Sequence, residues 1–483
     1  VLSGEVFGGG GTLELAAGAG TGTIGGLGGS ILGFGHIAVD AGAGWHLTGA
    51  NSIASGVTLS NAAAIIIDGT FGNQGVIDNS ALIRLSAKAE LDNHGQIFLV
   101  GDVGISPDTG ASGTTFVNDG LLEKKSGTGT SSVREAITDF GHIAVKSGTL
   151  DLAGIGNTIA GVISGAGTID FRLGSTTLEA GAAVTTAFAE ITGSGARLIL
   201  ATSLTYAHAF SAATGTVLTI DSAKTLTLTG AANFVGDTIA GAGHLTTKGA
   251  TTLSAVTLSA TGEWLNAGTV GAAGKLTVGD AGGDKSIFFN EATGVFDITG
   301  TGGIGVGANT ASRFDNAGLL ERTGPTGTGI IAVKVLNTGT IEAASGVLDF
   351  TGAVSGGGAL DIGAGATLAF ASTVAGAGHA AFTGAKGVLQ LGDAAAFKAS
   401  VSGFAAGQTI DARGGGFGAA TTLAYSGTSS SGVLTLTDGA SIARIALIGQ
   451  YAAANFKAAS DGHGGVDITF VAAPAAPALA TPG

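Results

Sequence analysis

Internal repetition constrains the fold of this chain more than any other feature of its sequence. A short motif, Asn-x-Gly-x followed by Val, Ile or Leu, recurs with its first residue at Asn73, Asn93, Asn118, Asn266, Asn316 and Asn337. Neighbouring copies are 20 residues apart (73 to 93), 25 apart (93 to 118) and 21 apart (316 to 337). A period of this length is typical of solenoids, in which one repeat cannot bury its apolar face alone and stacks on the next.

The segments between these motifs alternate apolar and polar residues and end in glycine turns. Residues 225–229, 347–351 and 433–437 carry an apolar side chain at every second position, which indicates a strand with one buried face. Glycine accounts for 90 of the 483 residues and interrupts almost every window that could form a helix. We therefore predict an all-β fold, a right-handed parallel β-solenoid with glycine-rich turns.

Longer blocks are duplicated on top of the short period. Residues 34–39 recur as residues 140–145, which is 106 positions later, and residues 116–123 match residues 314–321, which is 198 positions later. Copying of several rungs together is a simple way for a solenoid to lengthen. We assign residues 1–400 to solenoid repeats on this basis.

The sequence changes character near residue 400, where the Asn-x-Gly motif stops. Residues 401–471 form a different block, which we interpret as a C-terminal β-module. Prolines are rare before it, but Pro474, Pro477 and Pro482 crowd the end of the chain. Proline cannot donate to a strand ladder, so residues 472–483 are expected to be a flexible Ala/Pro tail.

Three segments of this block carry a family resemblance. They read SGFAAGQTID (residues 402–411), IALIGQYAAANF (445–456) and ASDGHGGVDIT (459–469). This stretch of about 70 residues resembles the C-terminal module of large, repeat-rich, adhesin- or autotransporter-like proteins secreted by proteobacteria, especially α-proteobacteria. Their pattern is GF-x-x-G-D-x-ID, LLGQY-x-A-x-F and SDGHGGT, so Gln408 and Val466 depart from it. The resemblance implies export and a surface or matrix role, and it implies no catalytic residues.

Charge and hydropathy exclude several kinds of partner. The net charge is −14 and no basic block is present, so nucleic acid is not an expected partner. Apolar runs end after three to six residues, which is far too short for a membrane span. The absence of cysteine excludes disulfides and thiolate metal sites. Because the printed chain does not begin with methionine, we expect a segment to precede residue 1.

The repeated asparagines are interpreted as structural turn positions. Asparagine and glycine both tolerate positive φ, and asparagines repeated at one corner can stack and hydrogen-bond along the axis. The eight histidines are scattered, without a pair spaced four residues apart, and predict no metal site. The sequence Glu123-Lys124-Lys125, echoed by Glu321-Arg322, is interpreted as a solvated strand end.

No catalytic or cofactor site is predicted. Most acids are interpreted as isolated in turns or on single strands, for example Asp68, Asp170, Asp361 and Asp467, whereas β-helix enzymes need two or three carboxylates on one face. Residues 461–467 are a loose relative of a calcium-binding nonapeptide, but tandem copies are absent. We expect no enzyme and no cofactor beyond an incidental calcium ion.

Two classes of function remain open at this point. The first is a structural protein, secreted to the extracellular space or the bacterial surface, which self-assembles end to end into a filament, sheath, surface layer or biofilm matrix. Its expected partners are copies of itself, with cell-surface polysaccharide as a further candidate. The alternative is an adhesin stalk or autotransporter-type passenger that binds a host, a substratum or a polysaccharide. A polysaccharide-active β-helix enzyme is a remote third reading.

Overall fold

The computed structural model describes residues 4–259, 261–376, 378–414, 416–418 and 420–472. Its strands stack in parallel into a β-solenoid of about 19 turns, so the predicted fold class is confirmed. The chain divides into two compact units, Val1–Leu245 (unit 1) and Thr246–Gly483 (unit 2), which are described separately. The expected Ala/Pro tail, apart from residue 472, lies outside the described residues.

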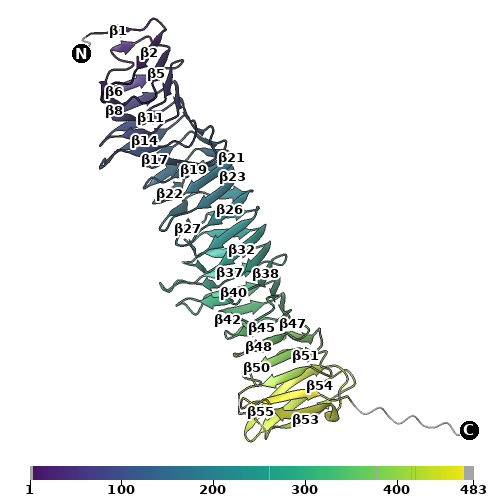
Figure 1. The fold of residues 1–483 in the computed structure, drawn as a ribbon. Helices are drawn as coiled ribbons and strands as arrows, with labels where there is room; N and C mark the ends of the chain where they lie inside the picture. Colours follow the sequence, from purple (N-terminus) through teal and green to yellow (C-terminus); the bar gives the residue numbers. More distant parts are fainter. Residues whose placement is uncertain (1–3, 260, 377, 415, 419, 473–483) are drawn as a thin grey trace, which may run out of the picture. The chain divides into compact units, whose positions relative to one another are not determined.

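Each turn of unit 1 contributes strands to three columns, which we call A, B and C; β11, β14 and β17 of column A follow one another in Figure 1. Column A contains β11 (Glu90–Asn93), β14 (Thr115–Asn118), β17 (Ile137–Asp139), β20 (Asn157–Ile159), β22 (Ser175–Leu178), β24 (Arg197–Leu200), β27 (Val217–Ile220) and β30 (Thr238–Ala240). Column B contains β2 (Thr12–Leu15), β5 (His36–Val39), β7 (Thr58–Asn61), β9 (Val76–Asn79), β12 (Gln96–Leu99), β15 (Leu121–Lys124) and β18 (His142–Val145). Column C contains β3 (Gly22–Ile24), β10 (Ile83–Leu85), β13 (Ile105–Pro107), β16 (Thr130–Val133), β19 (Thr149–Leu152), β26 (Ala209–Ala212) and β29 (Ala232–Val235).

Some strands of unit 1 are long enough to turn a corner and serve two columns. These are β6 (Trp45–Ile53), β8 (Ile65–Asn73), β21 (Val162–Phe171) and β23 (Ala183–Ile191). Shorter pieces complete the unit: β1 (Val6–Phe7), β4 (Ile31–Leu32), β25 (Leu204–Tyr206) and β28 (Thr225–Leu228). Strand β31 (His244–Thr247) spans the division between the units.

The strands of unit 2 also fall into three columns, which we call D, E and F. Column D contains β33 (Val256–Leu258), β36 (Leu276–Val278), β39 (Ile304–Val306), β42 (Thr328–Ile331), β45 (Val347–Phe350), β48 (Thr367–Phe370), β50 (Val388–Leu391) and β52 (Thr409–Ala412). Column E contains β34 (Glu263–Asn266), β37 (Ile287–Asn290), β40 (Arg313–Asn316), β43 (Lys334–Asn337) and β46 (Val354–Ser355). Column F contains β32 (Ala250–Ser254), β35 (Thr269–Ala272), β38 (Val295–Ile298), β41 (Leu319–Arg322), β44 (Thr340–Ala343), β47 (Ala359–Ile362), β49 (His379–Phe382) and β51 (Ser400–Ser402).

The strand direction changes at the end of unit 2. Strand β52 pairs antiparallel with β57 (Val466–Phe470), which pairs antiparallel with β56 (Phe456–Ser460). Strand β51 pairs parallel with β55 (Ser441–Ile448), which leads antiparallel into β54 (Ser431–Asp438) and β53 (Thr422–Gly427). A short 3₁₀ helix, Ala453–Asn455, precedes β56. This change from parallel to antiparallel pairing begins after β51 and β52. The domain boundary expected near residue 400 remains a prediction.

The core is built by the alternation that the sequence shows. In β12, Ile97 and Leu99 are buried while Gln96 is exposed, as expected when successive side chains of a strand point to opposite faces. Inward-facing residues of the same type also stack on one another in neighbouring rungs. In column E, the rings of Phe288 and Phe314 lie parallel at 4.9 Å between centroids, so each rung covers the apolar face of the last.

Candidate functional site

The asparagines of unit 1 form a hydrogen-bonded ladder inside the corner between columns A and B. Asn73 Nδ2 donates to Asn93 Oδ1, and Asn93 Nδ2 donates to Asn118 Oδ1, both at 2.6 Å. The same Nδ2 of Asn93 donates to the carbonyl of Leu121 at 3.1 Å. All three asparagines are fully buried. Burial without partners would be costly, so each rung supplies the partner for the amide of the next.

A second asparagine ladder runs through column E of unit 2. Asn266 Nδ2 donates to Asn290 Oδ1 at 2.9 Å, and the chain continues through Asn316 to Asn337 at 2.8 Å for each step. The sequence motif missed Asn290, because its turn reaches glycine only at Gly294, four residues later. The alignment of Phe288 to Asn290 with Phe314 to Asn316 is the signal that could have revealed it.

Asp139 occupies the same position in the rung that follows Asn118 and was also missed. It accepts a hydrogen bond from Asn118 Nδ2. A carboxylate has no donor for a further rung, so the side-chain ladder ends there. Burial raises the pKa of Asp139 to about 6, although the bond from Asn118 opposes that shift.

The six turn asparagines do not use the positive φ that asparagine tolerates. The non-glycine residues with positive φ are Lys88, Ala223, Ala255 and Lys386 among those described. The asparagines instead end strands in extended conformation, and their role lies in the side chain. Glycine follows two residues later because a Cβ at Gly95 would collide with the carbonyl oxygen of Gly75 in the previous rung.

Lys124 and Arg322 are buried, which corrects their interpretation as solvated strand ends. Both side chains are 0% exposed. Lys124 Nζ donates to the carbonyl of Gly101 (3.2 Å), the carbonyl of Ser126 (3.3 Å) and Asp102 Oδ1 (2.9 Å). The guanidinium of Arg322 donates to the carbonyls of Gly300, Thr326 and Gly327. These duplicated cations thus fasten the long turns that follow β15 and β41.

Three acids on adjacent rungs of unit 1 stack into one column, so Asp170 is not isolated. Asp151, Asp170 and Glu190 lie directly opposite one another in column C. Arg172 approaches the first two, with Nε 3.8 Å from Asp151 Oδ2 and Nη1 3.7 Å from Asp170 Oδ2. Thr192 donates to Asp170 Oδ2 at 2.6 Å.

Burial decides the chemistry of this acid column. It raises the pKa of Asp151 to about 6 and also raises the pKa values of Asp170 and Glu190, and the charge of Asp170 adds to the shifts of Asp151 and Glu190. The side chains of Asp151 and Asp170 are only 5% and 3% exposed. Burial therefore favours the protonated form of these acids and leaves little of Asp151 and Asp170 in contact with solvent.

Unit 2 carries a similar column of four acids, which includes Asp361. Asp297, Glu321, Glu342 and Asp361 follow one another in column F. Burial raises the pKa of Glu321, and the charges of Asp297 and Glu342 raise it further. Thr323 Oγ1 donates to Asp297 Oδ2 at 2.7 Å. The interpretation of these acids as isolated is therefore wrong in both units.

Residues 402–411 and 459–469 meet at the closing strands of unit 2. Asp411 lies opposite Asp467, and Arg413 Nε is 2.7 Å from Asp411 Oδ2 and 3.8 Å from Asp461 Oδ2. Asp461 Oδ1 accepts the backbone N–H groups of His463 (2.7 Å) and Gly465, and the bond from His463 holds the pKa of Asp461 below its usual value. These residues therefore link β52 to the turn before β57.

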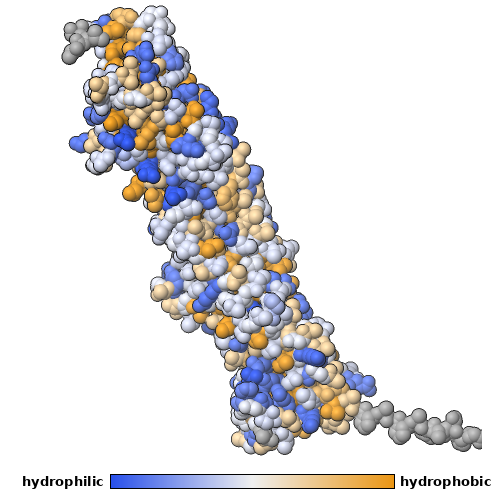
Figure 2. Space-filling view, in the orientation of Figure 1, coloured by the Kyte–Doolittle hydropathy of each residue, from blue (hydrophilic) through white to orange (hydrophobic). Residues whose placement is uncertain are grey.

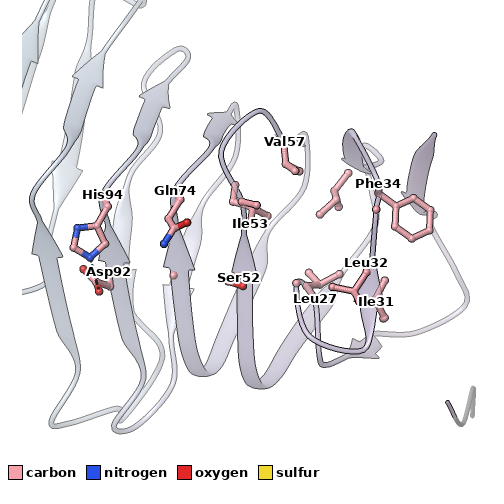
Figure 3. A pocket seen from close by; sticks show the side chains of 15 residues that line it. Leu27, Ile31, Leu32, Phe34, Ser52, Ile53, Val57, Gln74, Asp92 and His94 are labelled. Carbon is pink, nitrogen blue, oxygen red and sulfur yellow. Dashed lines mark hydrogen bonds and ion pairs between the residues drawn. The ribbon is translucent and has the colours of Figure 1, made fainter. Parts of the chain in front are cut away.

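A groove of about 460 Å³ lies on the outer surface of unit 1 (Figure 3). Its apolar end is lined by Leu27, Ile31 and Leu32, which gather together in the view. Its polar end is lined by Asp92 and His94. The face of unit 1 seen in Figure 2 shows the same mixture, with hydrophobic patches among hydrophilic ones near the N-terminal rungs. No residue of this groove was predicted as a site.

A cluster of potential metal ligands adjoins the groove. Ligand atoms of Asp92, His94 and Asp119 lie within 4.8 Å of one another, the one such group in the part of the chain that the structure describes. His94 Nε2 is 3.1 Å from Asp92 Oδ2, and its Nδ1 is 3.3 Å from Asp119 Oδ2. Each ring nitrogen faces a different carboxylate, so the arrangement is that of an imidazole held between two acids. The expectation of no cofactor beyond incidental calcium stays a prediction.

Comparisons with known proteins return no match. No family model, no curated protein and no solved structure matches the chain. Among the described residues, no helix has the length and apolar character needed to cross a membrane. The class that can be stated is therefore the one the fold defines, a parallel β-solenoid repeat protein.

Proposed function

We propose that the chain is a secreted structural protein of the bacterial exterior that self-assembles end to end into a filament, sheath or surface layer. The observation that carries the proposal is the presence of unpaired strand edges. Among the described residues, β2 and β3 of unit 1 each pair with one strand only. In unit 2, β53 and β56 also pair with one strand only. Free N–H and C=O groups on such edges are templates for a further strand.

The internal construction of the units supports a structural role. Many of their buried polar groups form hydrogen bonds between neighbouring rungs, as in the two asparagine ladders. Asp151 and Asp170 come closest to a catalytic pair, but their side chains are buried and lie beside Arg172. Contacts between two different ends of a subunit generate an open fibre when they do not close into a ring.

Sedimentation velocity and electron microscopy of the purified chain test this proposal. We expect polymers that grow with concentration at neutral pH. Thr23→Lys places a charge on edge strand β3, where Thr23 is exposed, and should shorten the polymers. Thr115→Lys changes an exposed threonine of β14, a strand that pairs with a neighbour on each side, and should leave the length of the polymers unchanged. A stable monomer at high concentration would overturn the proposal and favour the adhesin stalk.

A further inference from the structure

The floor of the groove on unit 1 lies at Gly72, which has no side chain to fill the space above it. Gly72 lies in register between Ser52 of the preceding rung and Asp92 of the next. Farther along this outward row of column A, β14 and β17 carry Val117 and Thr138. A Cβ built on Gly72 would meet only Ser52 Cβ, at 3.7 Å, so the space above this residue is open.

The two walls of the groove differ in chemistry. Leu27, Ile31 and Leu32 present aliphatic surface at one end. Gln74, Asp92 and His94 present amide, carboxylate and imidazole groups at the other (Figure 3). A volume of about 460 Å³ with apolar lining and a few polar groups is typical of a site for a small organic ligand.

The polar end is held in place and is acidic. The ring nitrogens of His94 lie 3.1 Å from a carboxylate oxygen of Asp92 and 3.3 Å from one of Asp119. The two carboxylates therefore orient the imidazole ring. Two carboxylates and one imidazole attract hydroxyl and amino groups and repel anions. The net charge of −14 acts in the same direction.

Pyranose rings combine the two properties that the groove matches, an aliphatic face and an edge of hydroxyl groups. The groove crosses successive rungs, which repeat at about 4.8 Å, close to the length of one sugar residue in a linear glycan. We propose that this groove binds a short stretch of a linear glycan whose sugars are neutral or carry amino groups. The inference goes beyond the proposed self-assembly and does not depend on it.

Isothermal titration calorimetry of the full chain with defined oligosaccharides tests the site. Cellotriose, chitotriose and fully deacetylated chitotriose are the probes, and oligogalacturonate is the anionic comparison. We expect saturable binding of at least one of the first three and weaker binding of oligogalacturonate. Failure of all three neutral or amino probes to bind, or preferential binding of oligogalacturonate, would overturn the proposal.

Variants locate the binding in the groove. Gly72→Val fills the open floor, and Gly72 has no positive φ that would strain a larger residue. It should weaken binding by about tenfold or more, with unchanged circular dichroism. Thr138→Val alters the same outward row outside the groove and should leave binding unchanged. Undiminished binding by a folded Gly72→Val protein would place the glycan elsewhere and contradict the assignment.

Discussion

At the scale of single residues, buried polar groups in this solenoid differ by whether a neighbouring rung supplies a partner. Asn93 satisfies both ends of its amide through Asn73 and Asn118. Asp237 of unit 1 is equally enclosed, at 2% exposed, yet neither of its carboxylate oxygens has a hydrogen-bond partner. Burial raises the pKa of Asp237 to about 7. An ionised carboxylate is therefore destabilising at this position.

Replacement of Asp237 should reveal that cost. The pKa in the folded chain is above the unfolded value of about 3.9, so the folded state retains a proton that the unfolded state releases. The contribution of Asp237 to the free energy of unfolding is therefore greatest below about pH 4. It falls by about 1.4 kcal/mol per pH unit as the pH rises toward 7. Asp237→Asn should raise the melting temperature at pH 8 and have much less effect at pH 5, as measured by circular dichroism.

Asp221→Asn is the matched control for this experiment. Asp221 also lies in unit 1 but is only half-buried. Its replacement should change the melting temperature little at either pH. Equal effects of Asp237→Asn at pH 5 and pH 8 would contradict the role assigned to ionisation.

At the scale of elements, strands repeat with little variation while turns differ in length and need separate support. The turn after β15 is held by Lys124, and the turn after β41 is held by Arg322, each through backbone carbonyls. Such a cation stabilises a turn that has no strand partner of its own. The duplicated block thus preserved a mechanism for fastening turns as well as a strand.

Removal of the buried ammonium should destabilise its turn. Lys124→Met leaves the carbonyls of Gly101 and Ser126 without this donor, at a cost of about 1–3 kcal/mol for each unsatisfied group. We expect a lower melting temperature and faster proteolysis near residues 125–129. Lys125→Met is the control, because that side chain is 47% exposed beside Phe98. Equal effects of the two replacements would argue against the buried cation.

At the scale of the whole molecule, stacked strands and side-chain ladders link the rungs within each unit. The one potential ligand group among the described residues, Asp92 with His94 and Asp119, lies at the surface. The chain also lacks the tandem nonapeptides that fold on calcium.

Chelation should therefore leave the fold intact. We expect EDTA to cause no loss of β-type circular dichroism and no change in melting temperature. Readdition of calcium serves as the control for any effect of the chelator itself. A large, calcium-reversible loss of the β signal would place the protein in the calcium-dependent class instead.

The sequence by itself determined the class of fold and much of its interior. Alternation of apolar and polar residues depends on strand geometry alone, so it indicated which side chains point inward. The 20- to 25-residue period indicated stacked turns, and the repeated asparagines marked two corners that the structure then showed as ladders. These properties are local, and local patterns can be read directly from a sequence.

The tertiary structure decided which residues of different rungs meet. Asp151, Asp170 and Glu190 are 19 and 20 residues apart, so their alignment depends on the combined lengths of all turns between them. The groove above Gly72 depends on the same register, because Gly72 lies between Ser52 and Asp92 of the neighbouring rungs. Register along a solenoid is a sum over many turns, and small differences in turn length decide which side chains become neighbours.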